Sequence, residues 1–359
     1  MQDDLLNLYN VGFPDQWTTT KFEKSIAQGF YTEFFGTEPG LIVNWTWHGQ
    51  GWDGTGISGD AGLPTKEQSI IATLEQTPEI QNVLIYNFTD EFGVGGMPAL
   101  DKIYSLANTV MVGNVHPWLP RTQYFPYWYL MSKMFFNVTI EPRFDQCEHV
   151  YLCYNRKPHG HRIRMLELFY KHKLLDKGVF TMGYDTDNAR RLPADFVEIQ
   201  EKGYLTFDGN SADVDTSTNK MSADNPQYKI VADAFTLGNI DIWQKSFLNI
   251  VNETECNIPW QATPFVTEKT FKPIAGKRPF IINGDQGIND LVKQMGFETF
   301  EDMVTLDSLT DFIKETTPDQ CLMLYKKYED KIEHNYHHFH DYINQLKDQY
   351  SFLDSCLNP

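Results

Sequence analysis

Two widely separated segments share one pattern, in which a strand runs into a polar turn and then into a helix. The first segment extends from Tyr154 to Arg164, and the second extends from Ser246 to Phe280. Each segment places Asn, Arg, Glu or Lys where a strand ends, and open α/β sheets bind their ligands outside the carboxyl ends of strands. The two segments therefore predict an α/β fold with a site for a phosphate-bearing ligand such as a sugar nucleotide.

The size and charge of the chain narrow this expectation. With 359 residues the chain is too long for one ordinary core, which favours two domains. Its net charge of −18 opposes non-specific adhesion to nucleic acid or to an anionic membrane. Basic residues nevertheless gather between 149 and 177. Such a cluster either lines a phosphate pocket or forms a solvated helix face, and the sequence leaves both open.

Cysteine usage and the absence of long apolar runs bear on location. The chain has 5 cysteines and no CxxC pair, which argues against a disulfide framework or a structural zinc site and predicts free thiols in a reducing compartment. The first residues, Met-Gln-Asp-Asp, lack the basic and apolar regions of a signal peptide. No run reaches the ~18 apolar residues that a membrane span needs. We expect a cytoplasmic protein without a membrane span.

Apolar runs and helical periodicity alternate along the chain. This order predicts two Rossmann-like, doubly wound parallel sheets in domains 1–145 and 146–315, with a C-terminal helical segment at 316–359. Pro273 is expected to stop the helix that begins after Thr267, and Pro318 to open the last helix. The predicted strands are 41–45, 83–88, 109–114, 149–154, 178–182, 247–251 and 279–282, and the predicted helices are 161–175, 267–272, 286–295 and 319–349.

The turn after the second segment's strand holds Thr267, Glu268 and Lys269 at the start of a helix. A threonine is a good N-cap, and the unpaired N–H groups of a helix N-terminus bind phosphate readily. Lys269 would add a charge for a diphosphate, and Glu268 either binds ribose hydroxyls or only complements the helix dipole. Arg162 suits bidentate phosphate recognition, while Asn155 and Arg156 end their strand and act in the site or in an ordinary turn.

Several motifs in this order carry a resemblance to a known family. They are a strand followed by Asn and a helical Arg, then Phe-Leu-x-x-x-Asn-Glu-Thr, Phe-Val-Thr-Glu-Lys and Arg-Pro-Phe-Ile. The region of about residues 149–300, under half the chain, resembles the donor-binding half of fucosyltransferase-type GT-B glycosyltransferases. Thr267 to Ile274 and Gly296 to Phe300 are similar to blocks in glycosyltransferase-like proteins of large viruses and phages.

The resemblance implies a metal-independent, inverting hexosyltransferase that moves a sugar from a nucleotide-diphosphate donor to an acceptor hydroxyl. No cofactor is implied beyond the co-substrate, a UDP- or GDP-sugar, and the acceptor would be a glycan or another hydroxyl compound. A viral protein would work in the host cytoplasm. Arg162 matches the phosphate ligand, Glu268 the ribose ligand and Lys269 the diphosphate ligand. The implied donor site also includes Asn155, Arg156, Asn252, Glu253, Thr267 and Lys272.

Two features of the chain depart from the family pattern. Asn252, Glu253 and Thr254 invert the family's Glu-Asn-Ser order, and Phe265 replaces a Tyr. These differences put fucose itself in doubt.

An inverting transferase needs a base that takes the proton of the acceptor hydroxyl, usually a carboxylate. Asp90 and Glu91, just past the strand at 83–88, are the candidates for this role, although ordinary loop carboxylates look the same. Two Asp-x-Asp triplets, at 185–187 and 213–215, have a spacing that can hold a divalent cation, but so acidic a chain produces such matches by chance.

Two other functions stay open. One is a phage-type glycosyltransferase that acts on hydroxymethylated DNA bases, so that nucleic acid enters only as the acceptor. The other is a non-catalytic relative that binds a nucleotide or a glycan.

Overall fold

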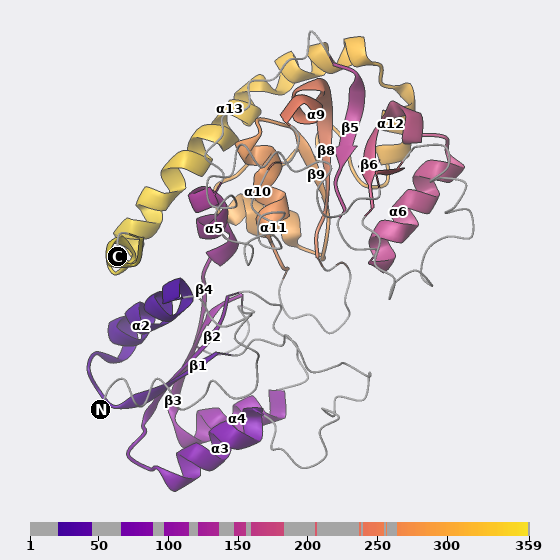
Figure 1. The fold of residues 1–359 in the computed structure, drawn as a ribbon. Helices are drawn as coiled ribbons and strands as arrows, with labels where there is room; N and C mark the ends of the chain where they lie inside the picture. The colour runs from indigo at the N-terminus through magenta and orange to yellow at the C-terminus, as the bar shows by residue number, and fades with distance from the viewer. Residues whose placement is uncertain are drawn as a thin grey trace. The chain divides into compact units, whose positions relative to one another are not determined.

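The structure, a computed structural model, describes residues 21–44, 66–88, 97–114, 121–135, 147–155, 159–182, 205–206, 237, 240–254, 256 and 264–357. The chain divides into two compact units (Figure 1). Unit 1 comprises Met1–Tyr127, Ile258–Thr263 and Asn344–Pro359, and unit 2 comprises Trp128–Asn257 and Pro264–Ile343. The functional domains expected from the sequence, at 1–145, 146–315 and 316–359, stay a prediction.

Unit 1 contains a four-stranded sheet in the order β1-β2-β3-β4, and all of its strand pairs are parallel. The strands are β1 (Gly40–Asn44), β2 (Asn82–Asn87), β3 (Asn108–Gly113) and β4 (Thr122–Tyr124). The helices α3 (Lys66–Gln76) and α4 (Met97–Leu106) connect β1 to β2 and β2 to β3. The first three strands confirm the expectation from the sequence.

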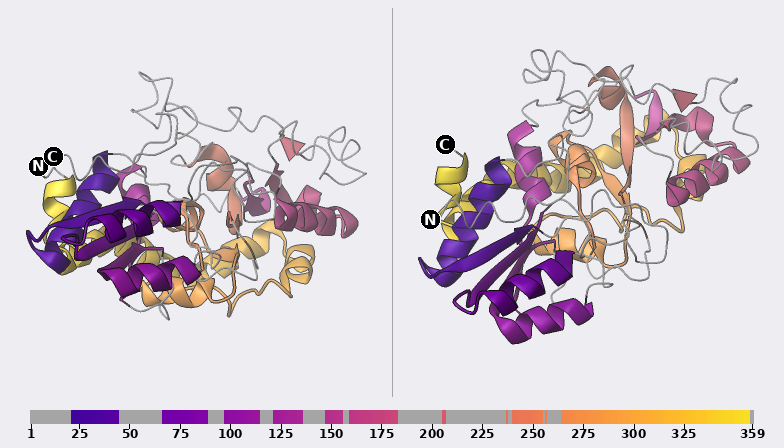
Figure 2. Two further views of the ribbon diagram at one scale, coloured as in Figure 1. Left: turned by 90° about the horizontal axis from the view of Figure 1, so that it is seen from below. Right: turned by 60° about the horizontal axis from the view of Figure 1, so that its bottom comes forward.

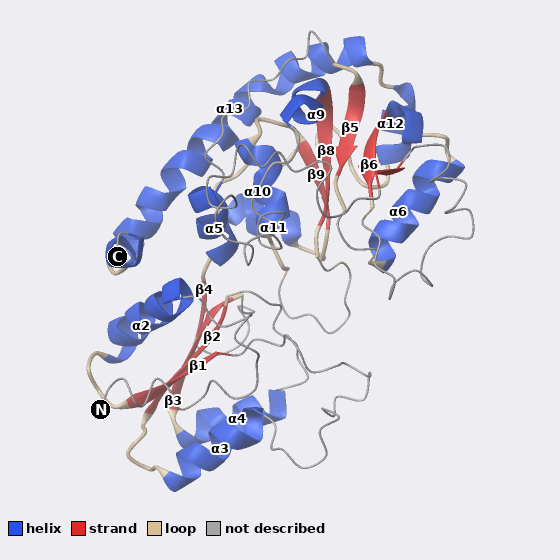
Figure 3. Ribbon diagram, in the orientation of Figure 1, coloured by secondary structure: helices blue, strands red, loops and turns tan. Residues whose placement is uncertain are grey.

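Both faces of this sheet are covered by helices, as Figure 3 shows. Val83 and Ile85 of β2 join a core with Ile70 and Leu74 of α3 and Ile103 of α4. The opposite face carries α2 (Lys21–Phe35), and the right-hand view of Figure 2 shows α2 and the α3–α4 pair on opposite sides of the strands.

The α2 side of unit 1 is held by aromatic packing. Phe30 of α2 packs edge-on against Phe125, Tyr350 and Phe352, with ring centroids 5.0, 5.0 and 4.9 Å away. The C-terminal part of the chain therefore belongs to this core, together with the short helix α14 (Leu353–Leu357).

Unit 2 contains a five-stranded sheet in the order β7-β6-β5-β8-β9, again with all pairs parallel. The chain starts at β5 in the middle, moves outward through β6 and β7, and then returns to add β8 and β9 on the other side. Right-handed crossovers place α6 (Gly160–Lys171) and α10 (Glu268–Ala275) on opposite faces of such a sheet. The strands are β5 (His149–Cys153), β6 (Gly178–Thr181), β7 (Leu205–Thr206), β8 (Ser246–Asn252) and β9 (Phe280–Asn283).

Further helices complete the described part of the chain. They are α5 (Tyr127–Phe135), the 3-10 turn η4 (Leu175–Lys177), α9 (Ile240–Lys245), α11 (Ile288–Gln294), α12 (Leu309–Glu315) and α13 (Pro318–Gln349). In unit 2, Phe339 of α13 packs edge-on against Tyr129 of α5, with ring centroids 5.5 Å apart. Within the described ranges, no helix combines the length and the apolar character that crossing a membrane requires.

The structure corrects the sequence expectation at Pro273. We expected this residue to stop its helix, but α10 continues to Ala275 with Pro273 inside it. Proline removes one backbone donor, and in a helix this short the loss falls in the last turn. The helix ends instead where Lys277 adopts the left-handed conformation, with φ 52°.

A prediction concerns the packing of α2. A Cβ atom on Gly29 would overlap the Phe352 ring, so Gly29→Ala must push that ring out of the aromatic cluster. We expect the variant to lose about 1–3 kcal/mol of unfolding free energy, although alanine favours the helix itself. Urea denaturation measures the loss. Gly160→Ala is the matched control, because the nearest atom to its Cβ lies 3.5 Å away; equal stability of the two variants would contradict the packing argument.

Candidate functional site

The candidate site lies at the carboxyl ends of β5 and β8 in unit 2. The connection after β5 leads to β6 on one side of this strand pair, and the connection after β8 leads to β9 on the other side. Open α/β sheets bind ligands at such a switch point. Asn155 follows β5, and Asn252, Glu253 and Thr254 end or follow β8, so the sheet brings together residues from both predicted segments.

A ladder of side-chain amides crosses the carboxyl edge of this sheet. Asn283 Nδ2 donates to Asn252 Oδ1 at 2.6 Å, and Asn252 Nδ2 donates to Asn155 Oδ1 at 2.9 Å. Asn155 in turn donates from Nδ2 to the Thr181 carbonyl at 3.1 Å and from its backbone N–H to Thr181 Oγ1 at 3.0 Å. The ladder joins the ends of β9, β8, β5 and β6. Asn155 and Asn252 are buried, so their amides brace the strands.

Two side chains of α6 hold the end of β8 from the side. Arg162 donates from Nη2 to the carbonyls of Asn252 at 3.3 Å and of Glu253 at 2.8 Å. His161 Nε2 lies 2.9 Å from the Glu253 carbonyl and donates to it. Burial, together with the positive charge of Arg162, lowers the pKa of His161 to about 4, so the ring is neutral at pH 7. Arg162 is only 2% exposed and acts here as a tether between α6 and β8.

The carboxylate of Glu253 occupies the N-terminus of α10. Its Oε1 accepts from the Thr267 N–H at 3.1 Å and from Thr270 Oγ1 at 2.6 Å, and its Oε2 accepts from Thr267 Oγ1 at 2.5 Å. Burial raises the pKa of Glu253, against the opposing effects of Lys269 and the threonine hydroxyls. We expected a ligand phosphate at this helix end. The structure places a protein carboxylate there, which meets the same need for negative charge.

Lys269 forms the more open part of the site. Its Nζ contacts Glu268 Oε1 at 2.8 Å, Thr254 Oγ1 at 3.1 Å and Thr267 Oγ1 at 3.3 Å, and its side chain is 25% exposed. Burial alone would raise the pKa of Glu268, but Lys269 and Lys272 hold that pKa below its ordinary value. A buried carboxylate and a partly exposed cation therefore lie side by side where a ligand can reach the cation.

Some predicted site residues lie outside the described part of the chain. They are Arg156, the proposed bases Asp90 and Glu91, and both Asp-x-Asp triplets. The other members of the site were predicted from the sequence, whereas Asn283, Thr181, His161 and Thr270 were not given a role in it. A signal for Asn283 was present, because it follows the apolar run Phe280-Ile281-Ile282 just as Asn252 follows its own strand.

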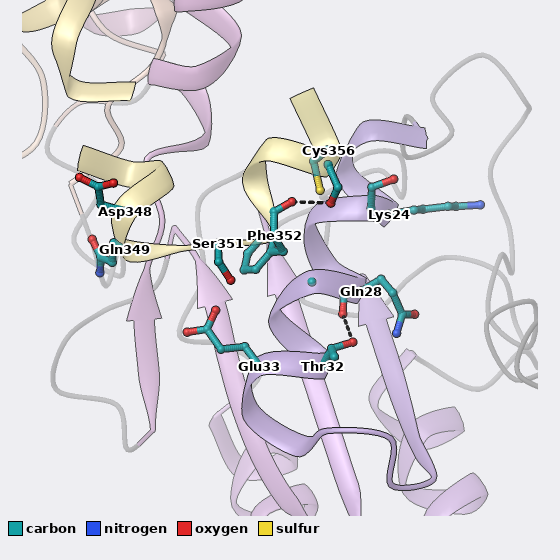
Figure 4. Close-up of a pocket in the computed structure, with 12 residues that line it drawn as sticks. Lys24, Gln28, Thr32, Glu33, Asp348, Gln349, Ser351, Phe352 and Cys356 are labelled. Carbon is teal, nitrogen blue, oxygen red and sulfur yellow. Dashed lines mark hydrogen bonds between the residues drawn. The ribbon is translucent and has the colours of Figure 1, made fainter. Parts of the chain in front are cut away.

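A groove of about 860 Å³ lies elsewhere, in unit 1 between α2 and the C-terminal residues (Figure 4). Lys24, Gln28, Glu33, Asp348 and Phe352 are among its lining residues. Its two hydrogen bonds drawn in Figure 4 join Thr32 Oγ1 to the Gln28 carbonyl and Ser355 Oγ to the Phe352 carbonyl, so they are local helix contacts. We place the candidate site at the switch point, where strand ends, a helix start and charged groups converge.

Comparison with known proteins adds no relative. No protein-family model matches the chain, and the searches of curated proteins and of solved structures find no match.

The amide ladder predicts a stability effect. Asn252→Ala removes the central amide and leaves buried groups of Asn155 without it, so we expect a loss of roughly 2–4 kcal/mol of unfolding free energy. Asn289→Ala, which removes only an exposed hydrogen bond to Glu301, is the control and should change stability by less than about 0.5 kcal/mol. Chemical denaturation measures the unfolding free energy of both variants. Equal losses would show that the amide ladder stabilises the protein no more than an exposed hydrogen bond does.

The lowered pKa of His161 predicts that the stability of the fold depends on pH. Because its pKa is lowered on folding, the unfolded chain binds a proton first as the pH falls from about 6.5, the ordinary value, to about 4. The contribution of neutral His161 to the free energy of unfolding is complete above about pH 6.5 and is lost as the pH falls to about 4. His161→Gln cannot bind the proton and keeps a donor for the Glu253 carbonyl, so its stability should decline less with acid. His337→Gln, at a position 71% exposed, should follow the wild type. An unchanged slope in His161→Gln would refute this assignment.

Proposed function

We propose that the chain is a glycosyltransferase that moves a sugar from a nucleoside-diphosphate donor to an acceptor hydroxyl. The donor would lie over the carboxyl edge of the second sheet, in a GT-B arrangement of two Rossmann-like domains. The observation that carries the proposal is the convergence of Thr254, Glu268 and Lys269 beside the β5–β8 switch point. The resemblance in the sequence points to the same residues.

The contacts support separate roles for the groups that hold the site together and the groups that would bind the donor. Lys269 would bind the diphosphate, since its side chain is a partly exposed cation beside Glu268 and Thr254. Glu268 would accept hydrogen bonds from the ribose. Arg162 and Glu253 would be positioning residues, because both are bound to the strand end or the helix start, whereas Glu268, which is also buried, is bound to the partly exposed Lys269. Asp90 or Glu91 as the acceptor base stays a prediction.

The non-catalytic alternative differs in one measurable property. A binding module would hold the nucleotide but would release no nucleoside diphosphate from the sugar nucleotide with any acceptor. A DNA-modifying enzyme would release it only in the presence of hydroxymethylated DNA. Product release with glycans and with such DNA therefore separates the three functions.

Nucleotide binding should depend on Lys269. In a thermal-shift screen of UDP, GDP, CMP, dTDP and their sugars, a ligand at 100-fold its Kd stabilises by about 2.7 kcal/mol. We expect a shift with one nucleoside diphosphate, and we expect Lys269→Ala to lose it because the cation that would bind the diphosphate is gone. Lys326→Ala makes the same change at an exposed position of α13 and should keep the shift. If no nucleotide stabilises the wild type, the sugar-nucleotide proposal fails.

A further inference from the structure

A lysine and a histidine of unit 2, neither of them part of the candidate site, form a close contact. Lys133 belongs to the last turn of α5, and His340 belongs to α13. The Lys133 Nζ atom lies 2.6 Å from His340 Nδ1. An amino group donates to a ring nitrogen that carries no proton, so Nδ1 is the acceptor and the ring proton is on Nε2. Both residues are partly exposed, so a small molecule can reach the pair.

Aromatic side chains surround this contact. The Tyr336 ring meets the His340 ring edge-on, with centroids 4.6 Å apart, and the Phe339 ring meets it edge-on at 5.5 Å. Phe339 is fully buried, and its backbone carbonyl accepts from the Tyr129 hydroxyl of α5 at 2.7 Å. Lys133 Nζ lies 5.7 Å from the centroid of the Phe339 ring. The packing of α5 against α13 therefore holds the amino group and the imidazole together.

The partners of Lys133 differ from those of a neighbouring lysine. Lys277 Nζ lies 4.4 Å from the centroid of the Tyr336 ring and forms an ion pair with Glu333 at 3.1 Å. Among the ion pairs of the described residues, none includes Lys133. A carboxylate in contact holds a lysine in its charged form, whereas a neutral imidazole adds no opposite charge. Lys133 therefore lacks the contact that most favours an ammonium.

The protonation of the two groups agrees with these contacts. Burial lowers the pKa of Lys133, and the charge of Asp341 opposes this effect. Burial and the charge of Lys133 lower the pKa of His340, so the ring is mostly neutral at pH 7. The charges of His337 and Lys277 act in the same direction, and that of Asp341 acts against them. The neutral amine is the nucleophilic form of a lysine, and desolvation favours it.

We propose that Lys133 is an acylation site that takes an acyl group from an activated donor of the thioester class, with His340 as the proton acceptor. The Lys133 amine attacks the carbonyl carbon of the thioester, a C–N bond forms, and the C–S bond breaks. His340 Nδ1 takes the proton that the nitrogen loses and passes it to the leaving thiolate. An amine and a thioester thus become an amide and a thiol, and Lys133 loses its charge.

The acylation site is independent of the glycosyltransferase proposal, because the two share no residue. Lys133 and His340 come from α5 and α13, whereas the donor site is built from residues at the ends of β5 and β8 and the start of α10. Failure of one proposal therefore leaves the other standing.

The test treats the full chain with the thioester S-acetyl-N-acetylcysteamine, a neutral donor that an acidic chain does not repel, and maps acetylated lysines over time by mass spectrometry. We expect Lys133 to be acetylated several-fold faster than Lys326, an exposed lysine of α13. The ratio of the two rates cancels the reactivity of the reagent at each pH. It should fall below about pH 6.5, because a protonated imidazole cannot take the proton.

A variant separates the proton acceptor from the hydrogen-bond acceptor. The side-chain carbonyl of His340→Gln can still accept from Lys133 but cannot take its proton, so acetylation of Lys133 should fall several-fold while Lys326 keeps its rate. His337→Gln makes the same change at a position of α13 that is 71% exposed, and it should keep both rates.

Three results would overturn the proposal. One is a wild-type chain in which Lys133 is acetylated no faster than Lys326. Another is a ratio of the two rates that does not fall as the pH is lowered. The third is an unchanged rate at Lys133 in folded His340→Gln. Because the first two are measured on the wild type, they decide the matter even where the variant fails to fold.

Discussion

The buried carboxylate of Glu253 is the interaction on which the candidate site depends. A carboxylate with 0% exposure is costly unless donors surround it, and here Thr267 and Thr270 supply them at the start of α10. The same contacts fix α10 to the end of β8. Lys269, two residues after the N-cap, is thereby held beside Thr254 instead of swinging freely. The hydrogen bonds of the Glu253 side chain therefore also set the position of Lys269.

The ends of the parallel strands need a second constraint, because sheet hydrogen bonds stop there. The amide ladder from Asn283 to Thr181 supplies side-chain bonds in the place of backbone bonds. Arg162 adds a charged donor that reaches the β8 carbonyls from α6. Such polar networks are favourable only when nearly every group finds a partner. The carboxyl edge of this sheet is thus held together by hydrogen bonds between the protein's own groups.

Much of this architecture can be predicted from the sequence, and the parts that cannot be predicted have physical reasons. The apolar runs at 83–88 and 247–251 lie in central strands buried on both faces, so hydrophobicity alone marks them. Asn155 and Asn252 were predicted because they follow the apolar runs at 149–154 and 247–251, and Lys269 was predicted because it lies in the first turn of the helix that begins after Thr267. The sequence does not show that Glu253 reaches the start of α10 or that Arg162 turns to carbonyls, since both depend on packing between elements. The short strand β4 and the helix α5 were missed in a Pro- and aromatic-rich stretch, where neither periodicity is clear.

On the proposed function, the pairing of Lys269 with Glu268 has a consequence for binding. The chain carries a net charge of −18, so its overall field repels an anionic ligand, and attraction must come from groups close to it. Lys269 is already bound to the nearly buried Glu268 at 2.8 Å. A diphosphate that draws Lys269 away leaves Glu268 with fewer donors, and ribose hydroxyls are donors of the right kind. Lys269 and Glu268 would therefore change partners together. This exchange would couple recognition of the diphosphate to recognition of the ribose attached to it.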